Sequence, residues 1–128
     1  MPSAVKILLV EDDRAIQFGT MKRLSACGYE VLTADNGAEA LAQADAHLPN
    51  LILLDIRMPV MDGLTALRAL KDNPATANIP VIIVSASPGD QGSALDFGAE
   101  YFLRKPFSAD LLQSTVEHFV ATNCNAAN

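Results

Sequence analysis

The chain has no apolar stretch long enough to cross a membrane. None of its apolar runs approaches the roughly 20 residues that a membrane-spanning helix requires. The residues before Val5 also lack the apolar core of a secretory signal peptide. These two absences argue against a membrane protein and against secretion, and we expect a cytoplasmic location.

Basic residues are also scarce. The 128 residues include 9 Lys and Arg against 15 Asp and Glu, which gives a formal net charge of −6. Proteins that bind the phosphate backbone of nucleic acids carry clustered Lys and Arg side chains. The charge balance therefore argues against DNA or RNA as a direct ligand.

Cysteine occurs only twice, as Cys27 and Cys124. This single pair has neither the spacing of a zinc site nor the number needed for a disulfide framework. We therefore expect Cys27 to be a small core residue and Cys124 to lie in a polar tail.

Half of the residues are apolar, and many of them gather in short runs. The length predicts a single domain of residues 1–128, with a core at about 5–120 and a tail at 121–128. Runs short enough to be strands lie at residues 5–10, 30–34, 51–55, 81–84 and 100–104. Helical patterns separate them, and this alternation predicts a parallel sheet covered by helices on both faces.

Several helix starts are marked by side chains that can cap them. Asn36 and Ser108 are predicted N-caps, and Asp13 is an acid that favours the start of the helix after it. Apolar residues at helical spacing then predict the inward faces, which include Ile16 in the first helix and Leu48 in the second.

Polar side chains stand where four of the predicted strands end. Glu11 and Asp12 follow the first strand, Asp55 ends the third, Ser85 follows the fourth and Lys105 follows the fifth. In open parallel sheets, ligands bind beyond the carboxyl ends of the strands. The sequence therefore predicts that these groups meet at one sheet edge, in the layout of a divalent-metal and phosphoryl site.

Four segments carry a family resemblance. They read LVEDD at residues 9–13, LLDIRMPVMDG at 53–63, SA at 85–86 and FLRKPF at 102–107. In this order they resemble the receiver domain of bacterial two-component response regulators, over roughly residues 5–120. The resemblance implies a flavodoxin-like α/β fold, which is a doubly wound five-stranded parallel sheet in the order 2-1-3-4-5.

The resemblance also implies a chemistry centred on Asp55. In the family, the aspartate at this position accepts a phosphoryl group from a sensor histidine kinase or a phosphotransfer protein. The implied cofactor is Mg²⁺, for which Mn²⁺ can substitute. Its implied ligands are Asp12, Asp55, the backbone carbonyl of Arg57 and, through a water molecule, Glu11, which suits a hard cation that prefers oxygen.

Further family positions imply a conformational switch. Lys105 would pair with Asp55 and then with a phosphoryl oxygen, and the Ser85 hydroxyl would bind another such oxygen. Phe102 occupies the place of the aromatic residue that turns inward when Ser85 moves, and Pro106 would follow a cis peptide bond. The protein would be no enzyme in the usual sense, because its chemistry is confined to its own aspartate, and its downstream target is not identified.

Three other functions share parts of this pattern. A phosphatase of the haloacid dehalogenase type has a second acid two residues after its nucleophile, where this chain has Arg57. A flavodoxin-like electron carrier cradles a phosphate in its first loop, and Glu11, Asp12 and Asp13 would repel that phosphate. A receiver-like domain that works without phosphorylation usually lacks an acid, the aspartate or the lysine, and this chain retains all of them.

One segment departs from the family pattern. The spacing from Ser85 to Lys105 is shorter than is usual, and the shortfall lies in the turn-rich segment after the fourth strand. In the family, this region belongs to the output face. We therefore expect an altered readout surface, and we expect residues 87–97 to be the most mobile part of the fold.

Overall fold

The computed structural model describes residues 5–126, with side chains as far as residue 120. The strands are β1 (Lys6–Val10), β2 (Glu30–Ala34), β3 (Leu51–Asp55), β4 (Val81–Ser85) and β5 (Tyr101–Arg104). The helices are α1 (Arg14–Ala26), α2 (Gly37–His47), α3 (Gly63–Asp72), α4 (Gln91–Asp96) and α5 (Ala109–Ala126), with a short 3-10 helix η1 (Pro88–Asp90) before α4. Strands and helices alternate as the sequence predicts.

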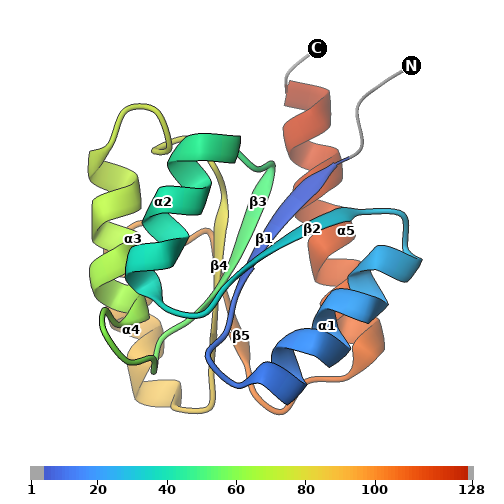
Figure 1. Cartoon of the computed structure of the whole chain (residues 1–128), viewed down its shortest axis with the longest axis horizontal. Helices are drawn as coiled ribbons and strands as arrows, with labels where there is room; N and C mark the ends of the chain where they lie inside the picture. The colour runs from blue at the N-terminus through green and yellow to red at the C-terminus, as the bar shows by residue number, and fades with distance from the viewer. Residues whose placement is uncertain (1–4, 127–128) are drawn as a thin grey trace.

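The five strands form one parallel sheet in the order β2-β1-β3-β4-β5 (Figure 1). This confirms the doubly wound α/β fold. The register pairs Asp55 with Val84 and Ser85 with Arg104, so β3, β4 and β5 end at nearly the same level. The half-polar strand β2 lies at the sheet edge, whereas every residue of β3 and β4 is buried.

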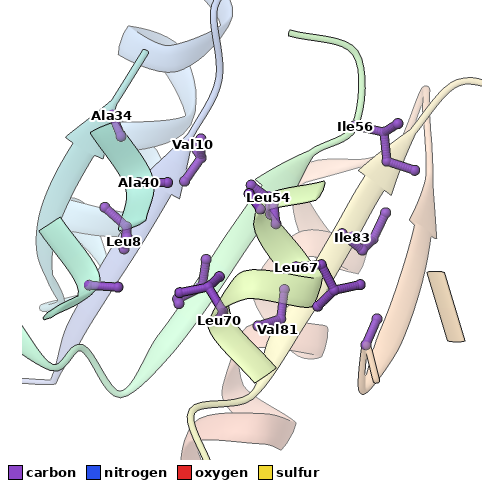
Figure 2. Close-up of a cluster of buried hydrophobic side chains, with 14 of the residues drawn as sticks. Leu8, Val10, Ala34, Ala40, Leu54, Ile56, Leu67, Leu70, Val81 and Ile83 are labelled. Carbon is purple, nitrogen blue, oxygen red and sulfur yellow. The ribbon is translucent and has the colours of Figure 1, made fainter. Parts of the chain in front are cut away.

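Helices cover both faces of the sheet and create two apolar clusters. On one face, α2, α3 and α4 pack over inward side chains such as Leu8, Leu54 and Ile83, as Figure 2 shows. On the other face, α1 and α5 cover the alternate residues of the same strands, such as Leu9 and Leu53. This alternation follows from the two-residue period of a strand, which points successive side chains to opposite faces.

The two predicted caps, Asn36 and Ser108, are present, and Asp13 also caps a helix start. The side chains of Asp13, Asn36 and Ser108 accept hydrogen bonds of 2.9–3.1 Å from backbone N–H groups in the first turns of α1, α2 and α5. Such bonds satisfy donors that have no partner within the helix. For α1, the cap also fixes the direction in which the chain leaves the acidic residues at the end of β1.

Several expectations were wrong. Cys27 is exposed and not a core residue, because it lies at the C-cap of α1, beyond the last buried turn of that helix. Leu48 is 55% exposed, since it adopts a left-handed conformation with φ 45° that ends α2 and turns it away from the sheet. Ile16 is 47% exposed beside the loop after β5. The prediction that Cys124 lies in a tail is not tested, because the side chain of Cys124 lies outside the described residues.

Gly63 provides a test of how α3 is held against the site. It is the first residue of α3, and its N–H donates to the carbonyl of Ile56 at 2.8 Å. A Cβ at this position would collide with the backbone carbonyl oxygen of Asp55 and lie 2.7 Å from the Cα of Ile56. We expect Gly63→Ala to lower the free energy of unfolding by about 2 kcal/mol, because backbone atoms cannot yield as a flexible side chain can.

Gly19 is the matched control, because nothing lies within 4 Å of a Cβ added there in the middle of α1. Gly19→Ala should raise the free energy of unfolding by roughly 0.5–1 kcal/mol through helix propensity and backbone entropy. Urea denaturation measures both values. Equal stability of Gly63→Ala and the wild type would contradict a close approach of α3 to the end of β3.

Candidate functional site

Three carboxylates meet at the carboxyl edge of the sheet. Glu11 and Asp12 follow β1, Asp55 ends β3, and each contributes an oxygen atom to a group in which all such atoms lie within 4.8 Å of one another. Glu11 is 5% exposed and Asp55 is 8% exposed, whereas Asp12 is exposed. The cluster is therefore buried on one side and open on the other, which leaves a route for a ligand.

Lys105 supplies a positive charge beside the cluster. Its Nζ lies 3.1 Å from Oε1 of Glu11 and 3.5 Å from Oδ2 of Asp55. Burial lowers the pKa of Lys105, but the hydrogen bond to Glu11 and the charges of Asp55 and Glu11 outweigh burial and hold that pKa above its ordinary value. The lysine therefore stays charged at neutral pH, and its contribution to stability is lost only as the pH rises through that raised, alkaline pKa.

Glu11 is held in place from several sides. Its Oε1 accepts from Lys105, and its Oε2 accepts from the backbone N–H of Asp13 at 3.3 Å. Its own backbone N–H donates to the carbonyl of Ala34 at 3.1 Å, and its carbonyl accepts from the side chain of Gln17 at 2.9 Å. These bonds orient Glu11 more strongly than Asp12, whose exposed side chain lies at the open side of the cluster.

Ser85 lies at the end of β4 and is 2% exposed. Its hydroxyl donates to Oδ2 of Asp90 at 3.0 Å and accepts from the backbone N–H of Ser87 at 3.1 Å. Its carbonyl accepts from the backbone N–H of Lys105 at 2.9 Å, which ties the ends of β4 and β5 together. The hydroxyl therefore belongs to the same sheet edge as the carboxylates, but it is directed at Asp90.

Asp90 is a site residue that the sequence reasoning missed. It lies within the short, turn-rich segment after β4, and no sequence motif marks this residue individually. Its Oδ2 lies 3.7 Å from Nη2 of Arg57, in addition to its bond with Ser85. Asp90 and Arg57 line a crevice of about 480 Å³ together with Asp12. This crevice provides space for a ligand beside the acidic cluster.

The remaining predicted residues lie around this edge. Arg57 follows β3 with an exposed side chain. Phe102 is partly buried and packs against the apolar cluster beneath α2, α3 and α4. The peptide bond between Lys105 and Pro106 is cis. Over the part of the chain that the structure describes, no helix is both long and apolar enough to span a bilayer.

The fold and the edge cluster agree with the comparison to protein families. Residues 7–117 match the family model of the response regulator receiver domain, which is most of the chain. The chain therefore belongs to this family, and it is a receiver domain of the kind found in two-component systems.

Curated relatives include two named response regulators. The chain is 44% identical over 115 residues to response regulator PleD of Caulobacter vibrioides, an alignment that covers 88% of this chain and 25% of PleD. It is 43% identical over 107 residues to transcriptional regulatory protein PrrA of Mycobacterium tuberculosis, covering 80% of this chain and 44% of PrrA. The chain thus spans less than half the length of these relatives.

Solved structures match over nearly the whole chain. Chemotaxis protein CheY4 of Vibrio cholerae has a TM-score of 0.85 at 31% identity and covers 91% of this chain and 99% of its own. The receiver domain of sensor histidine kinase PA1611 of Pseudomonas aeruginosa has a TM-score of 0.87 at 30% identity, covering 93% of this chain and 99% of its own. That protein was solved with a magnesium ion coordinated in its active site cleft.

Proposed function

We propose that this receiver domain accepts a phosphoryl group on Asp55. The observation that carries the proposal is the position of Asp55, which ends the central strand β3 beside two further carboxylates and the ammonium group of Lys105. A carboxylate is a weak nucleophile, and phosphoryl transfer depends mainly on positioning and on neutralisation of charge. The buried Asp55 and the charged Lys105 meet both needs.

The proposed step moves one phosphoryl group between two side chains. A carboxylate oxygen of Asp55 forms a bond to the phosphorus atom of a phosphohistidine on a sensor kinase or phosphotransfer protein. The phosphorus–nitrogen bond breaks, and its electron pair stays on the imidazole of the donor. Lys105 then offsets the negative charge on a phosphoryl oxygen. Hydrolysis reverses the modification, since water adds to phosphorus and releases inorganic phosphate and the free carboxylate.

The residues present fit a hard divalent cation. Three carboxylates with oxygen atoms within 4.8 Å of one another suit Mg²⁺, which prefers oxygen ligands and uses few carboxylates. We assign Asp12, Asp55 and the carbonyl of Arg57 as its direct ligands, and Glu11 as a ligand through water. Bound there, Mg²⁺ or Mn²⁺ would supply positive charge that reduces the repulsion between the carboxylates and a phosphoryl group.

The signal would leave the site through Ser85. In the proposed activated state, its hydroxyl donates to a phosphoryl oxygen, and Phe102 turns toward the space that the movement opens. Because Phe102 packs on the cluster beneath α4, its rotation would alter the surface near α4 and β5. A partner protein or an attached output domain would read that change. The chemistry stays on the chain's own aspartate, so the domain acts as a switch rather than as an enzyme.

Acetyl phosphate tests the proposal without a cognate kinase. In the presence of Mg²⁺, the protein should gain a single phosphoryl group in a linkage that is stable to acid and labile to base, as expected of an acyl phosphate. Intact-mass measurement and peptide mapping detect it. Removal of divalent cations with EDTA should prevent the modification. A phosphoryl group on a hydroxyl residue, or equal modification in EDTA, would contradict the proposal.

A further inference from the structure

Asp90 stands at the N-cap of α4 but does not cap that helix. Aspartate is among the best N-cap residues, because its carboxylate accepts from N–H groups of the first turn. Here the side chain of Asp90 makes no such bond. It instead accepts from the Ser85 hydroxyl at 3.0 Å, and it is only 19% exposed. The carboxylate is therefore directed into the site rather than along its own helix.

The hydrogen bond to Asp90 uses the only donor proton of the Ser85 hydroxyl. A serine hydroxyl has one donor, and it cannot serve two acceptors fully at once. Its acceptor side is also engaged by the N–H of Ser87 at 3.1 Å. In this state, the hydroxyl has no proton left for a phosphoryl oxygen on Asp55. Activation through Ser85 thus requires that the hydrogen bond to Asp90 breaks.

The negative charge of Asp90 also opposes phosphorylation of Asp55. Asp90 lines the crevice beside Asp12, so its carboxylate adds negative charge where a phosphoryl group would arrive. Arg57 is its nearest basic partner, at 3.7 Å, but the side chain of Arg57 is 73% exposed. An ion pair that is so exposed is screened by water and offsets little of that charge.

We propose that Asp90 is a positioning residue that restrains the switch. It holds Ser85 in the unphosphorylated orientation, and phosphorylation has to displace it. This inference rests on the proposed phosphorylation of Asp55. Asp90 is the last residue of η1 and directly precedes α4, so its displacement moves the start of α4. The site is thereby coupled to the short segment after β4.

Beryllofluoride, a mimic of the phosphoryl group, provides the main test. At saturating Mg²⁺, we expect Asp90→Ala to bind it about tenfold more tightly than the wild type, equivalent to about 1.4 kcal/mol, because a charge-assisted bond no longer competes for Ser85. The matched control is Asp96→Ala, which removes the same charge from an exposed position at the end of α4. Its affinity should stay within about twofold of the wild type, since exposed charges contribute little. Isothermal titration calorimetry suits a chain that has no tryptophan.

Two further variants separate the hydrogen bond from other effects. Asp90→Asn keeps an acceptor oxygen but loses the charge, so its affinity should lie between those of the wild type and Asp90→Ala. In a Ser85→Ala background, the gain from Asp90→Ala should fall below about threefold, because the two residues then no longer interact. An undiminished tenfold gain in that background, or an Asp90→Asn variant that binds more weakly than the wild type, would overturn the inference.

Amide hydrogen exchange distinguishes a switch from a purely structural contact. Without ligand, residues 87–97 should exchange faster in Asp90→Ala than in the wild type, and with beryllofluoride the two proteins should match. Faster exchange without tighter beryllofluoride binding would mean that Asp90 has only a structural role, and it would overturn the inference.

Asp55→Asn provides the remaining control. Beryllofluoride binding that persists in this variant would contradict the proposed function itself, whereas binding lost there but equal in Asp90→Ala and Asp96→Ala would reject Asp90 alone.

Discussion

Asp55→Asn should abolish phosphoryl uptake from acetyl phosphate. The substitution keeps the shape of the side chain but replaces the proposed nucleophile, a carboxylate, by an amide, which cannot form the acyl phosphate. We expect labelling to fall by at least about a hundredfold, because removal of a nucleophile costs several orders of magnitude in rate. Glu11 is not expected to replace Asp55, since both of its carboxylate oxygens are already hydrogen-bonded.

Asp96→Asn is the matched control for this loss. It makes the same chemical change at an exposed acid on α4 and should leave both the extent and the rate of labelling unchanged. Circular dichroism melting curves of both variants verify that they fold. Substantial labelling of Asp55→Asn at another carboxylate would mean that the geometry around β3 does not select the acceptor.

Magnesium should raise the melting temperature of the protein by roughly 4–8 °C at a free concentration ten times its dissociation constant. A ligand that binds only the folded state stabilises it by about 1.4 kcal/mol at that concentration, and for a domain of this length such an increment corresponds to several degrees. The physical source is the carboxylate cluster, whose like charges lie within 4.8 Å and repel one another. Lys105 contacts two of the three carboxylates and offsets only part of this repulsion.

Asp12→Ala should change the melting temperature in opposite directions, relative to the wild type, without and with Mg²⁺. Without metal, it should melt higher than the wild type, because one of the repelling charges is gone. With Mg²⁺, it should lose most of the thermal increment, because the exposed carboxylate that we propose as a metal ligand is missing. Differential scanning calorimetry measures all four melting temperatures, and sodium chloride at equal ionic strength controls for general screening.

Asp13→Asn is a suitable companion variant. Asp13 is adjacent in sequence, but its side chain caps α1 and is not part of the cluster. Since asparagine is also a good cap, the folded state should persist, and the magnesium increment should stay close to that of the wild type. An equal magnesium increment in Asp12→Ala and the wild type would remove Asp12 from the metal site.

Much of the architecture was predictable because its signals are local. The apolar runs that became β1, β3 and β4 are short and end in polar residues, and their alternation with helical patterns indicated a parallel sheet. Caps such as Asn36 and Ser108 depend on a few neighbouring residues, so they were also correctly predicted. The errors at Cys27 and Leu48 arose where a helix ends, since a periodic pattern does not reveal at which residue the chain turns away.

The sequence by itself determined which groups stand at the ends of the strands, and a parallel sheet then brings Glu11, Asp12, Asp55 and Lys105 together. Only the tertiary structure decided how these groups pair. Lys105 lies closer to Glu11 than to Asp55, and Ser85 donates to Asp90 rather than pointing into open space. The physical reason is that strand ends follow from regular backbone geometry, whereas the path of an irregular segment such as residues 86–90 depends on its packing against the rest of the fold.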